Sequence, residues 1–206
     1  MMLLCLCVLT ACSSDDGDNN GDSNGKNGVY VINGHKFVDL GLPSGLLWAE
    51  CNIGASEPEE AGYSYRWGEV EADIVNEGYK FKDGNTYTKY TKKDAKTTLE
   101  PEDDAATVLW GKNCHIPTKK EFEELIKNCK WEFADEWGDA TVTGPNGNHI
   151  FLPKGTSSFI YGTSSFDTTY PTDQSAYSLQ LHKGGTYVAP CTNRIAPMHV
   201  RPVAEK

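Results

Sequence analysis

The five histidines are the side chains best suited to holding a metal ion, but their spacing does not favour that role. No two of them stand at the spacing of a helical zinc motif such as His-Glu-x-x-His. We therefore expect each to have a structural role in the core or at the surface. The five are His35, His115, His149, His182 and His199.

Three consecutive carboxylates, Glu102, Asp103 and Asp104, also have metal-binding chemistry. A calcium loop alternates its oxygen ligands along the chain, which a continuous acidic run does not reproduce. Helix capping fits better, because carboxylates at the start of a helix face its positive end. Ser44 lies in a turn containing Pro43, not between glycines as a nucleophilic serine does in Gly-x-Ser-x-Gly. The sequence therefore predicts no catalytic residue, no metal and no cofactor, with calcium binding left as the alternative.

Aromatic residues mixed with carboxylates and amides occur in two segments, residues 131–139 and 161–174. An aromatic ring can cover the apolar face of a sugar while carboxylates and amides bind its hydroxyls. The alternative is that these are ordinary loop and core residues. The candidate ligand-binding residues are Trp137, Asp139, Tyr161, Asp167, Tyr170, Asp173 and Gln174.

The N-terminus is a short apolar run, too short for a spanning helix, which needs about 20 apolar residues. It fits the apolar part of a signal peptide, although no Lys or Arg precedes it. Leu9-Thr10-Ala11-Cys12 resembles the lipobox of bacterial lipoproteins, in which the cysteine carries palmitate or a similar acyl chain and the chain is cut before it. Residues 1–11 are therefore predicted to be a signal peptide. A buried N-terminal strand is the alternative.

Residues 13–27 contain no apolar side chain and cannot form a core. Residues 12–27 are therefore expected to be a lipid-anchored flexible tether. Ser14-Asp15-Asp16 resembles the acidic export signal of Bacteroidetes surface lipoproteins. That resemblance implies an outer-membrane protein, lipid-anchored and exposed at the cell surface; an ordinary linker is the alternative.

The remaining residues, 28–206, are enough for one well-packed domain. The net charge of −10 and the lack of a basic patch exclude nucleic acid as a partner. Four cysteines follow Cys12, and in an exported protein an even number indicates two disulfides. Their spacing leaves all three pairings open, and four free thiols are the alternative. They are Cys51, Cys114, Cys129 and Cys191.

Two helices are expected among many strands. One covers about residues 102–110, with Pro101 in its first turn and Gly111 at its end. The other begins with a capping box formed by Thr118 and Glu121. Alternating and apolar runs predict strands at residues 29–32, 36–40, 46–49, 63–67, 140–143, 149–152, 158–161, 176–181, 186–189 and 198–203.

Several motifs occur in an order typical of one family. Those motifs are residues 41–49, 51–55, 65–69, 102–106, 116–122 and 200–203. By them the chain resembles the Fibrobacter major paralogous domain family, common in Bacteroidetes lipoproteins. That family is similar in turn to the C-type-lectin-like fold and to formylglycine-generating enzymes. The resemblance implies a single α+β domain of C-type-lectin-like type, with two helices, twisted and mainly antiparallel strands, and long loops.

The resemblance also bears on the cysteines. Cysteine is usual in the family at the positions of Cys51 and Cys129, and unusual at those of Cys114 and Cys191. It therefore implies the disulfides Cys51–Cys129 and Cys114–Cys191.

Three functions remain as hypotheses. The first is non-catalytic binding of a glycan or a surface protein, without calcium, because the calcium-lectin motifs do not match residues 57–59 and 137–139. The second is a structural component of a surface or fimbrial assembly. The third, an enzyme of the formylglycine-generating type, lacks the two nearby cysteines it needs. Binding predicts exposed aromatic and polar groups together; assembly predicts a free strand edge or an apolar patch.

Overall fold

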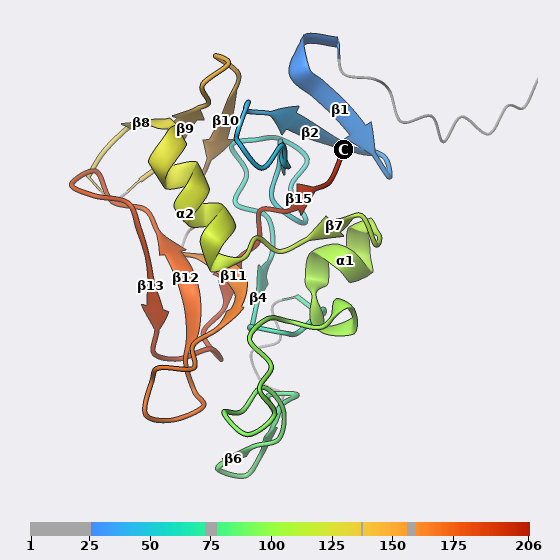
Figure 1. Ribbon diagram of the computed structural model, residues 1–206, viewed down its shortest axis with the longest axis vertical. Coiled ribbons are helices and arrows are strands. Elements are labelled where there is room, and N and C mark those ends of the chain that lie inside the picture. The colour runs from blue at the N-terminus through green and yellow to red at the C-terminus, as the bar shows by residue number, and fades with distance from the viewer. Residues whose placement is uncertain (1–25, 73–77, 137, 156–159) are drawn as a thin grey trace, which may run out of the picture.

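The computed structural model describes residues 26–72, 78–136, 138–155 and 160–206. Within these ranges the protein is an α+β domain with two α-helices and mostly antiparallel strands (Figure 1). None of the described helices has both the length and the apolarity that crossing a membrane requires.

The first sheet has the strand order β1-β2-β3-β15-β7, and every neighbouring pair in it is antiparallel. A short 3-10 turn, Lys26–Gly28, precedes it. Its first hairpin turns at Asn33 and Gly34, with φ angles of 50° and 81°, as the sequence predicts. The strands are β1 (Val29–Ile32), β2 (His35–Asp39), β3 (Leu47–Ala49), β15 (Val203–Ala204) and β7 (Cys114–His115).

The second sheet has the order β13-β12-β11-β14-β4 and contains one parallel pair, β11 with β14. Its strands are β4 (Ser64–Tyr65), β11 (Ile160–Phe166), β12 (Ala176–Gln180), β13 (Tyr187–Cys191) and β14 (Met198–His199). The sequence-based strand at 158–161 begins in residues that lie outside the described ranges, and β11 continues well beyond it.

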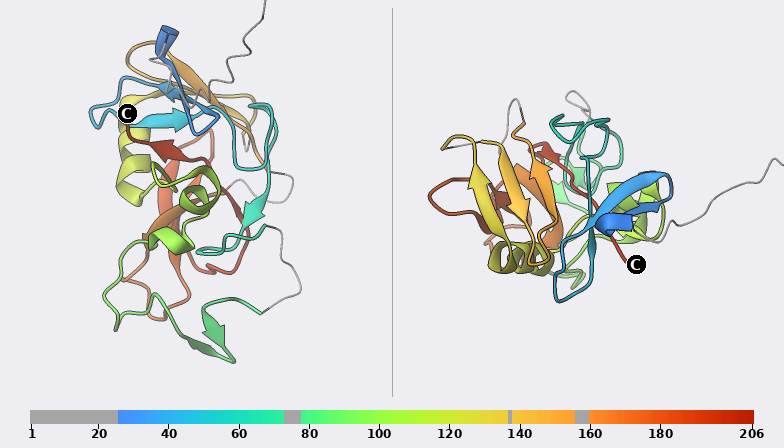
Figure 2. Two further views of the ribbon diagram at one scale, coloured as in Figure 1. Left: turned by 90° about the vertical axis from the view of Figure 1, so that its right-hand side faces the viewer. Right: turned by 90° about the horizontal axis from the view of Figure 1, so that it is seen from above.

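Two smaller sheets complete the fold. One has the order β10-β9-β8, with β8 (Lys130–Phe133), β9 (Ala140–Thr143) and β10 (His149–Leu152). The other is the hairpin of β5 (Lys82–Asp83) and β6 (Thr86–Tyr87), which projects at one end of the molecule (Figure 2). Neither β8 nor this hairpin is among the strands expected from the sequence.

The first predicted helix is in fact two elements, a 3-10 turn η2 (Pro101–Asp103) and the helix α1 (Ala105–Trp110). Asp104 separates them in an extended conformation, with φ −95° and ψ 111°. It leaves the helical region because its carboxylate caps α1, accepting a hydrogen bond from Thr107 N at 3.0 Å. The continuous helix predicted from residue 102 is therefore wrong, and of the acidic run only Asp104 is confirmed as a cap, because Asp103 pairs with Lys80 and Lys89 instead.

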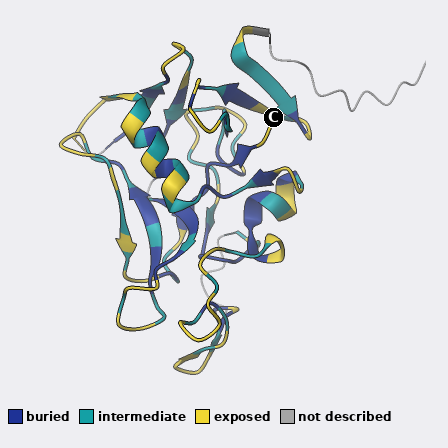
Figure 3. Cartoon of the chain, viewed as in Figure 1, coloured by how far each residue is buried: buried dark blue, intermediate teal, exposed yellow. Residues whose placement is uncertain are grey.

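The second helix, α2 (Lys119–Asn128), begins as the sequence predicts. Thr118 and Glu121 form both hydrogen bonds of the capping box. Phe122 and Leu125 are fully buried, and the helix lies across β11, β12 and β13 (Figure 3). Phe122 and Leu125 belong to one of three hydrophobic clusters, the one that contains Trp48.

Arg201 interrupts the strand predicted at residues 198–203. Its side chain is fully buried, and its Nε donates to Asn52 Oδ1 at 2.8 Å. The two terminal nitrogens donate to Ala49 O at 2.9 Å and to Phe151 O at 2.8 Å. The guanidinium therefore joins the first sheet to β10, and the chain forms β14 and β15 on either side of it.

Candidate functional site

The sequence-predicted binding residues do not form one surface. Trp137 lies outside the described residues. Asp139 precedes β9, at the other end of the molecule from the β5–β6 hairpin, and its carboxylate accepts Lys154 N at 2.8 Å. Tyr161 is fully buried, donating to Pro153 O at 2.7 Å and accepting from Asn52 Nδ2 at 3.2 Å. Tyr161 is a core residue, so its prediction as a ligand contact is wrong.

Asp167 is also fully buried and has a structural role instead of the predicted one. Its carboxylate accepts hydrogen bonds from Thr169 N at 2.9 Å and from Ser175 Oγ at 2.9 Å. Burial alone would raise its pKa, but these hydrogen bonds hold the pKa of Asp167 below its usual value. The charged carboxylate therefore fixes the loop that carries the remaining candidates.

That loop places Asp173 and Gln174 in a groove of about 670 Å³ beside the β5–β6 hairpin. Tyr170 belongs to the same loop and is partly exposed, but it does not line the groove. We call this feature the β5–β6 groove. It is lined by Lys82, Asn85, Thr86, Tyr87, Thr88, Thr91, Lys93, Thr172, Asp173 and Gln174.

Two contacts hold the walls of the groove together. Asp173 Oδ1 accepts the backbone N–H of Lys92 at 3.0 Å, which links the loop directly to the segment after β6. Arg194 lies behind the groove and bonds to both walls. Its backbone N–H donates to Gln174 O at 2.8 Å, and its guanidinium donates to Tyr90 O at 2.9 Å.

The guanidinium of Arg194 is fully buried in an aromatic cage. It lies over the rings of Tyr87 at 4.3 Å, Trp67 at 5.4 Å and Phe166 at 5.5 Å. Burial lowers its pKa, and burial is also the main cause of the raised pKa of Tyr87. The contact with Arg194 therefore fixes the position of the Tyr87 ring, which lines the groove.

A carboxylate cluster next to this region, Glu100, Glu102 and Asp103, has the proximity to hold a metal ion. Lysines occupy it instead. Lys89 Nζ lies 2.6 Å from Glu100 and 2.5 Å from Asp103, and Lys80 Nζ lies 2.5 Å from Asp103. Desolvation would lower the pKa of Lys89, but these carboxylates raise it. The cluster is therefore an ion-pair network in which lysine ammonium groups neutralise the carboxylates.

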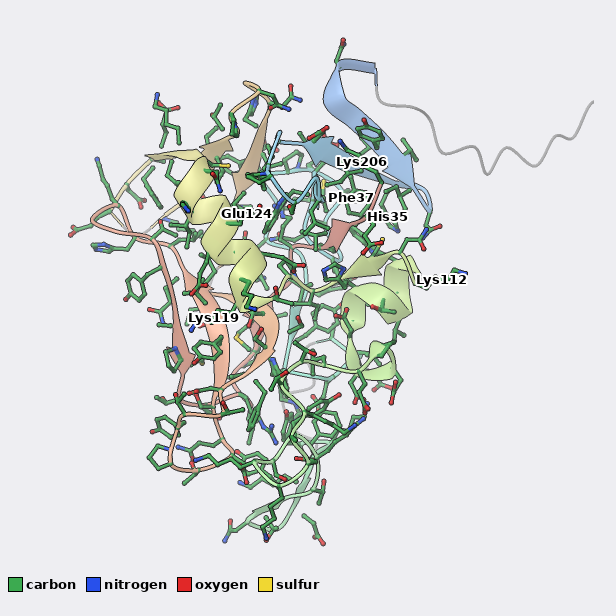
Figure 4. All side chains as sticks on the ribbon, viewed as in Figure 1. His35, Phe37, Lys112, Lys119, Glu124 and Lys206 are labelled. Carbon is green, nitrogen blue, oxygen red and sulfur yellow. The ribbon has the colours of Figure 1, made fainter. Side chains whose placement is uncertain are left out.

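A second concavity, the helix cleft, has a volume of about 340 Å³ and is lined by residues of α1, of the segment 98–104, and of the segment that leads from α1 to α2. Lys112 and Lys119 mark the two ends of that segment (Figure 4). His115 Nε2 lies 3.2 Å from each carboxylate oxygen of Glu121, and Asp104 accepts Ile116 N at 2.9 Å.

The ionisable groups of the helix cleft have shifted pKa values. Burial alone would lower the pKa of His115, but Glu121 and Asp104 raise it. Burial raises the pKa of Asp104, and it raises that of Cys114 to about 11. Each carboxylate already serves a helix cap, and no described hydroxyl or thiol hydrogen-bonds to the imidazole. This arrangement lacks an activated nucleophile.

Neither predicted disulfide is present, because all four cysteines are free thiols. Cys114 is in the hydrophobic cluster of Trp110, Cys129 packs against that of Trp48, and Cys191 against that of Trp67. Because Cys114 and Cys191 pack in separate clusters, their thiols do not meet to form the predicted disulfide. Cys51 lies outside all three clusters, beside a shallow pocket near His35. The thiols of Cys114 and Cys129 have pKa values raised to about 11 by burial, which makes them unreactive.

Four residues in or against the groove are not among the sequence-predicted binding residues: Tyr87, Lys82, Lys93 and Arg194. A signal for the hairpin is present in the sequence, since Asp83, Gly84 and Asn85 are typical turn residues. The sequence around the hairpin does not indicate that Arg194 stabilises it, because Arg194 lies far from the hairpin in the chain.

Comparisons with protein-family models, curated proteins and solved structures find no match to this chain.

Proposed function

We propose that this protein is a lipid-anchored cell-surface protein whose single domain binds carbohydrate without catalysis, and that the β5–β6 groove is the binding site. The observation that carries this proposal is the lining of the groove. Hydroxyl, amide and ammonium groups surround one supported aromatic ring, Tyr87. Such a ring can stack on a sugar while the polar groups bind its hydroxyls.

The proposed fold is of the C-type-lectin-like type. The ordered motifs at residues 41–49, 116–122 and 200–203 support it, as do the two helices and the mainly antiparallel strands. The proposed site differs from a calcium-dependent lectin site, because lysines neutralise the nearest carboxylate cluster.

A glycan array tests the function. The probe is the mature chain, residues 12–206, carrying Cys12→Ser to prevent acylation, with and without EDTA. We expect selective binding that survives EDTA and that falls in Gln174→Ala, while the distant surface variant Lys127→Ala binds normally. Absence of binding to every glycan would contradict the proposal and favour a protein partner.

The anchor has its own test. Globomycin blocks lipoprotein signal peptidase, so treated cells should accumulate the larger precursor. The Cys12→Ser variant should lose incorporation of labelled palmitate. A precursor of unchanged size under globomycin would contradict lipidation.

A structural role in a surface assembly is the second candidate. Strand β1 forms an edge of the first sheet among the described residues, and its sequence, Val29–Ile32, has no charge and no proline. Such an edge can pair with another chain. Analytical ultracentrifugation distinguishes the two candidates: assembly predicts concentration-dependent oligomers, and carbohydrate binding by a single domain predicts a monomer.

A further inference from the structure

The charges around the β5–β6 groove are unevenly compensated. On the side of η2, Lys80, Lys89 and Lys96 all pair with carboxylates of the Glu100 and Asp103 region. The two lysines that line the groove, Lys82 and Lys93, form no ion pair among the described residues. Among the described residues that line the groove, Asp173 is the only carboxylate, and one of its oxygens already accepts Lys92 N.

Arg194 adds a third positive charge behind the groove. Its guanidinium is fully buried and donates to two backbone carbonyls, Tyr90 O at 2.9 Å and Lys89 O at 3.0 Å, while its Nε has no acceptor among the described residues. Asp94 and Asp173 act on it only through space, because no described carboxylate forms an ion pair with it. Because its hydrogen bonds go to carbonyls and these two carboxylates act only from a distance, the buried charge keeps part of its field.

Tyr87 connects these charges to the groove. Lys82 Nζ lies 5.5 Å from the centre of its ring, and the Arg194 guanidinium lies 4.3 Å from it. A ligand that stacks on Tyr87 is therefore close to two cations, with Lys93 on the same lining. A hydroxyl-rich ligand with a negative group satisfies both the polar lining and the excess positive charge.

We infer that the β5–β6 groove selects acidic saccharides, in which a carboxylate or sulfate group pairs with Lys82 and Lys93. This inference rests on the proposed carbohydrate-binding function and names its ligand class. The net charge of −10 repels polyanions at long range, but physiological salt screens that repulsion beyond about 8 Å. Contacts inside the groove therefore decide the selectivity.

The test compares probes that differ only in charge. Isothermal titration of the mature Cys12→Ser chain uses tetragalacturonate and its fully methyl-esterified form, with dextran sulfate and dextran as the sulfated pair. We expect the acidic member of at least one pair to bind more tightly, and the pair that responds identifies the acidic group. The double variant Lys82→Gln/Lys93→Gln should lower that affinity about fivefold, as expected for two exposed charge pairs. Lys127→Gln, a matched surface change, should leave it unaltered.

Other outcomes overturn the inference in distinguishable ways. Equal binding of acidic and neutral members shows carbohydrate binding without charge selection, so the proposed function stands and the inference fails. Tetraglutamate serves as an acidic probe without sugar rings. If it binds as tightly as the acidic saccharides, the groove recognises charge alone and the saccharide class is excluded. Absence of any saccharide binding, on the array and here, overturns the proposed function itself.

Discussion

The β5–β6 groove and the helix cleft are both concave and both contain ionisable groups, yet those groups have different roles. At the helix cleft, Asp104 caps α1 by accepting from Thr107 N, Glu121 of α2 accepts from Thr118 N, and His115 pairs with Glu121. In the groove, Lys82 and Lys93 have no charged partner among the described residues. The comparison shows that burial and a structural ion pair can shift the pKa values in a cleft, so such shifts do not by themselves mark a functional site.

The largest effect is expected from removing the support of the groove. Arg194→Met leaves the carbonyls of Lys89 and Tyr90 without their buried donor, so unfolding should become easier by about 2–4 kcal/mol. Urea unfolding followed by fluorescence measures this, with Lys127→Met as the control. A stability equal to the parent would show that the cage does not hold the groove.

A smaller loss is expected in the helix cleft. Asp104→Ala removes the cap of α1 and the acceptor of Ile116 N, which should cost about 2 kcal/mol in urea unfolding. Asp104→Asn keeps an acceptor and should lose less. Ligand affinity should be unchanged in both variants, since the cleft is not the proposed site. A loss of glycan binding in a folded Asp104→Asn protein would reverse the roles assigned to the two regions.

Features set by neighbouring residues could be predicted from the sequence. The Asn33–Gly34 turn and the Thr118–Glu121 capping box are as expected, because their chemistry lies within a few positions. Features set by distant residues could not. Tyr161 and Asn52 meet only in the folded chain, and Arg194 reaches Tyr90 across the fold. Of the predicted binding residues, the neighbours Asp173 and Gln174 both line the β5–β6 groove, while burial excludes Tyr161 and Asp167 from ligand contact.

The helix cleft should also respond to pH. Glu121 and Asp104 raise the pKa of His115 in the folded protein, so protonation favours folding. The protonated imidazole stabilises the fold fully at pH values below 6.5, the pKa of histidine in the unfolded chain. This stabilisation is lost as pH rises through the higher pKa of His115 in the folded protein. The difference in unfolding free energy between the parent and His115→Gln should therefore shrink from pH 6 upward. A difference that is constant or grows with pH would contradict the ion pair.

The smallest effect on stability is expected at the groove surface. Gln174→Ala changes a partly exposed side chain with no side-chain hydrogen bond among the described contacts, so stability should change by less than about 0.5 kcal/mol. Glycan affinity should nevertheless fall. Thermal unfolding measures the stability of the variant, and titration of the same sample measures its glycan affinity. Unchanged affinity would exclude Gln174 from the binding site.

The position of β15 has a consequence for how the chain is made. Val203 and Ala204 pair with β3 on one side and with β7 on the other, so they form the middle of the first sheet. Until the ribosome has added these residues, β3 and β7 have no common partner and the sheet cannot close. The first sheet of the nascent chain therefore stays incomplete until β15 has been synthesised. A polypeptide in that state can still be threaded through a translocation channel, as the proposed export requires.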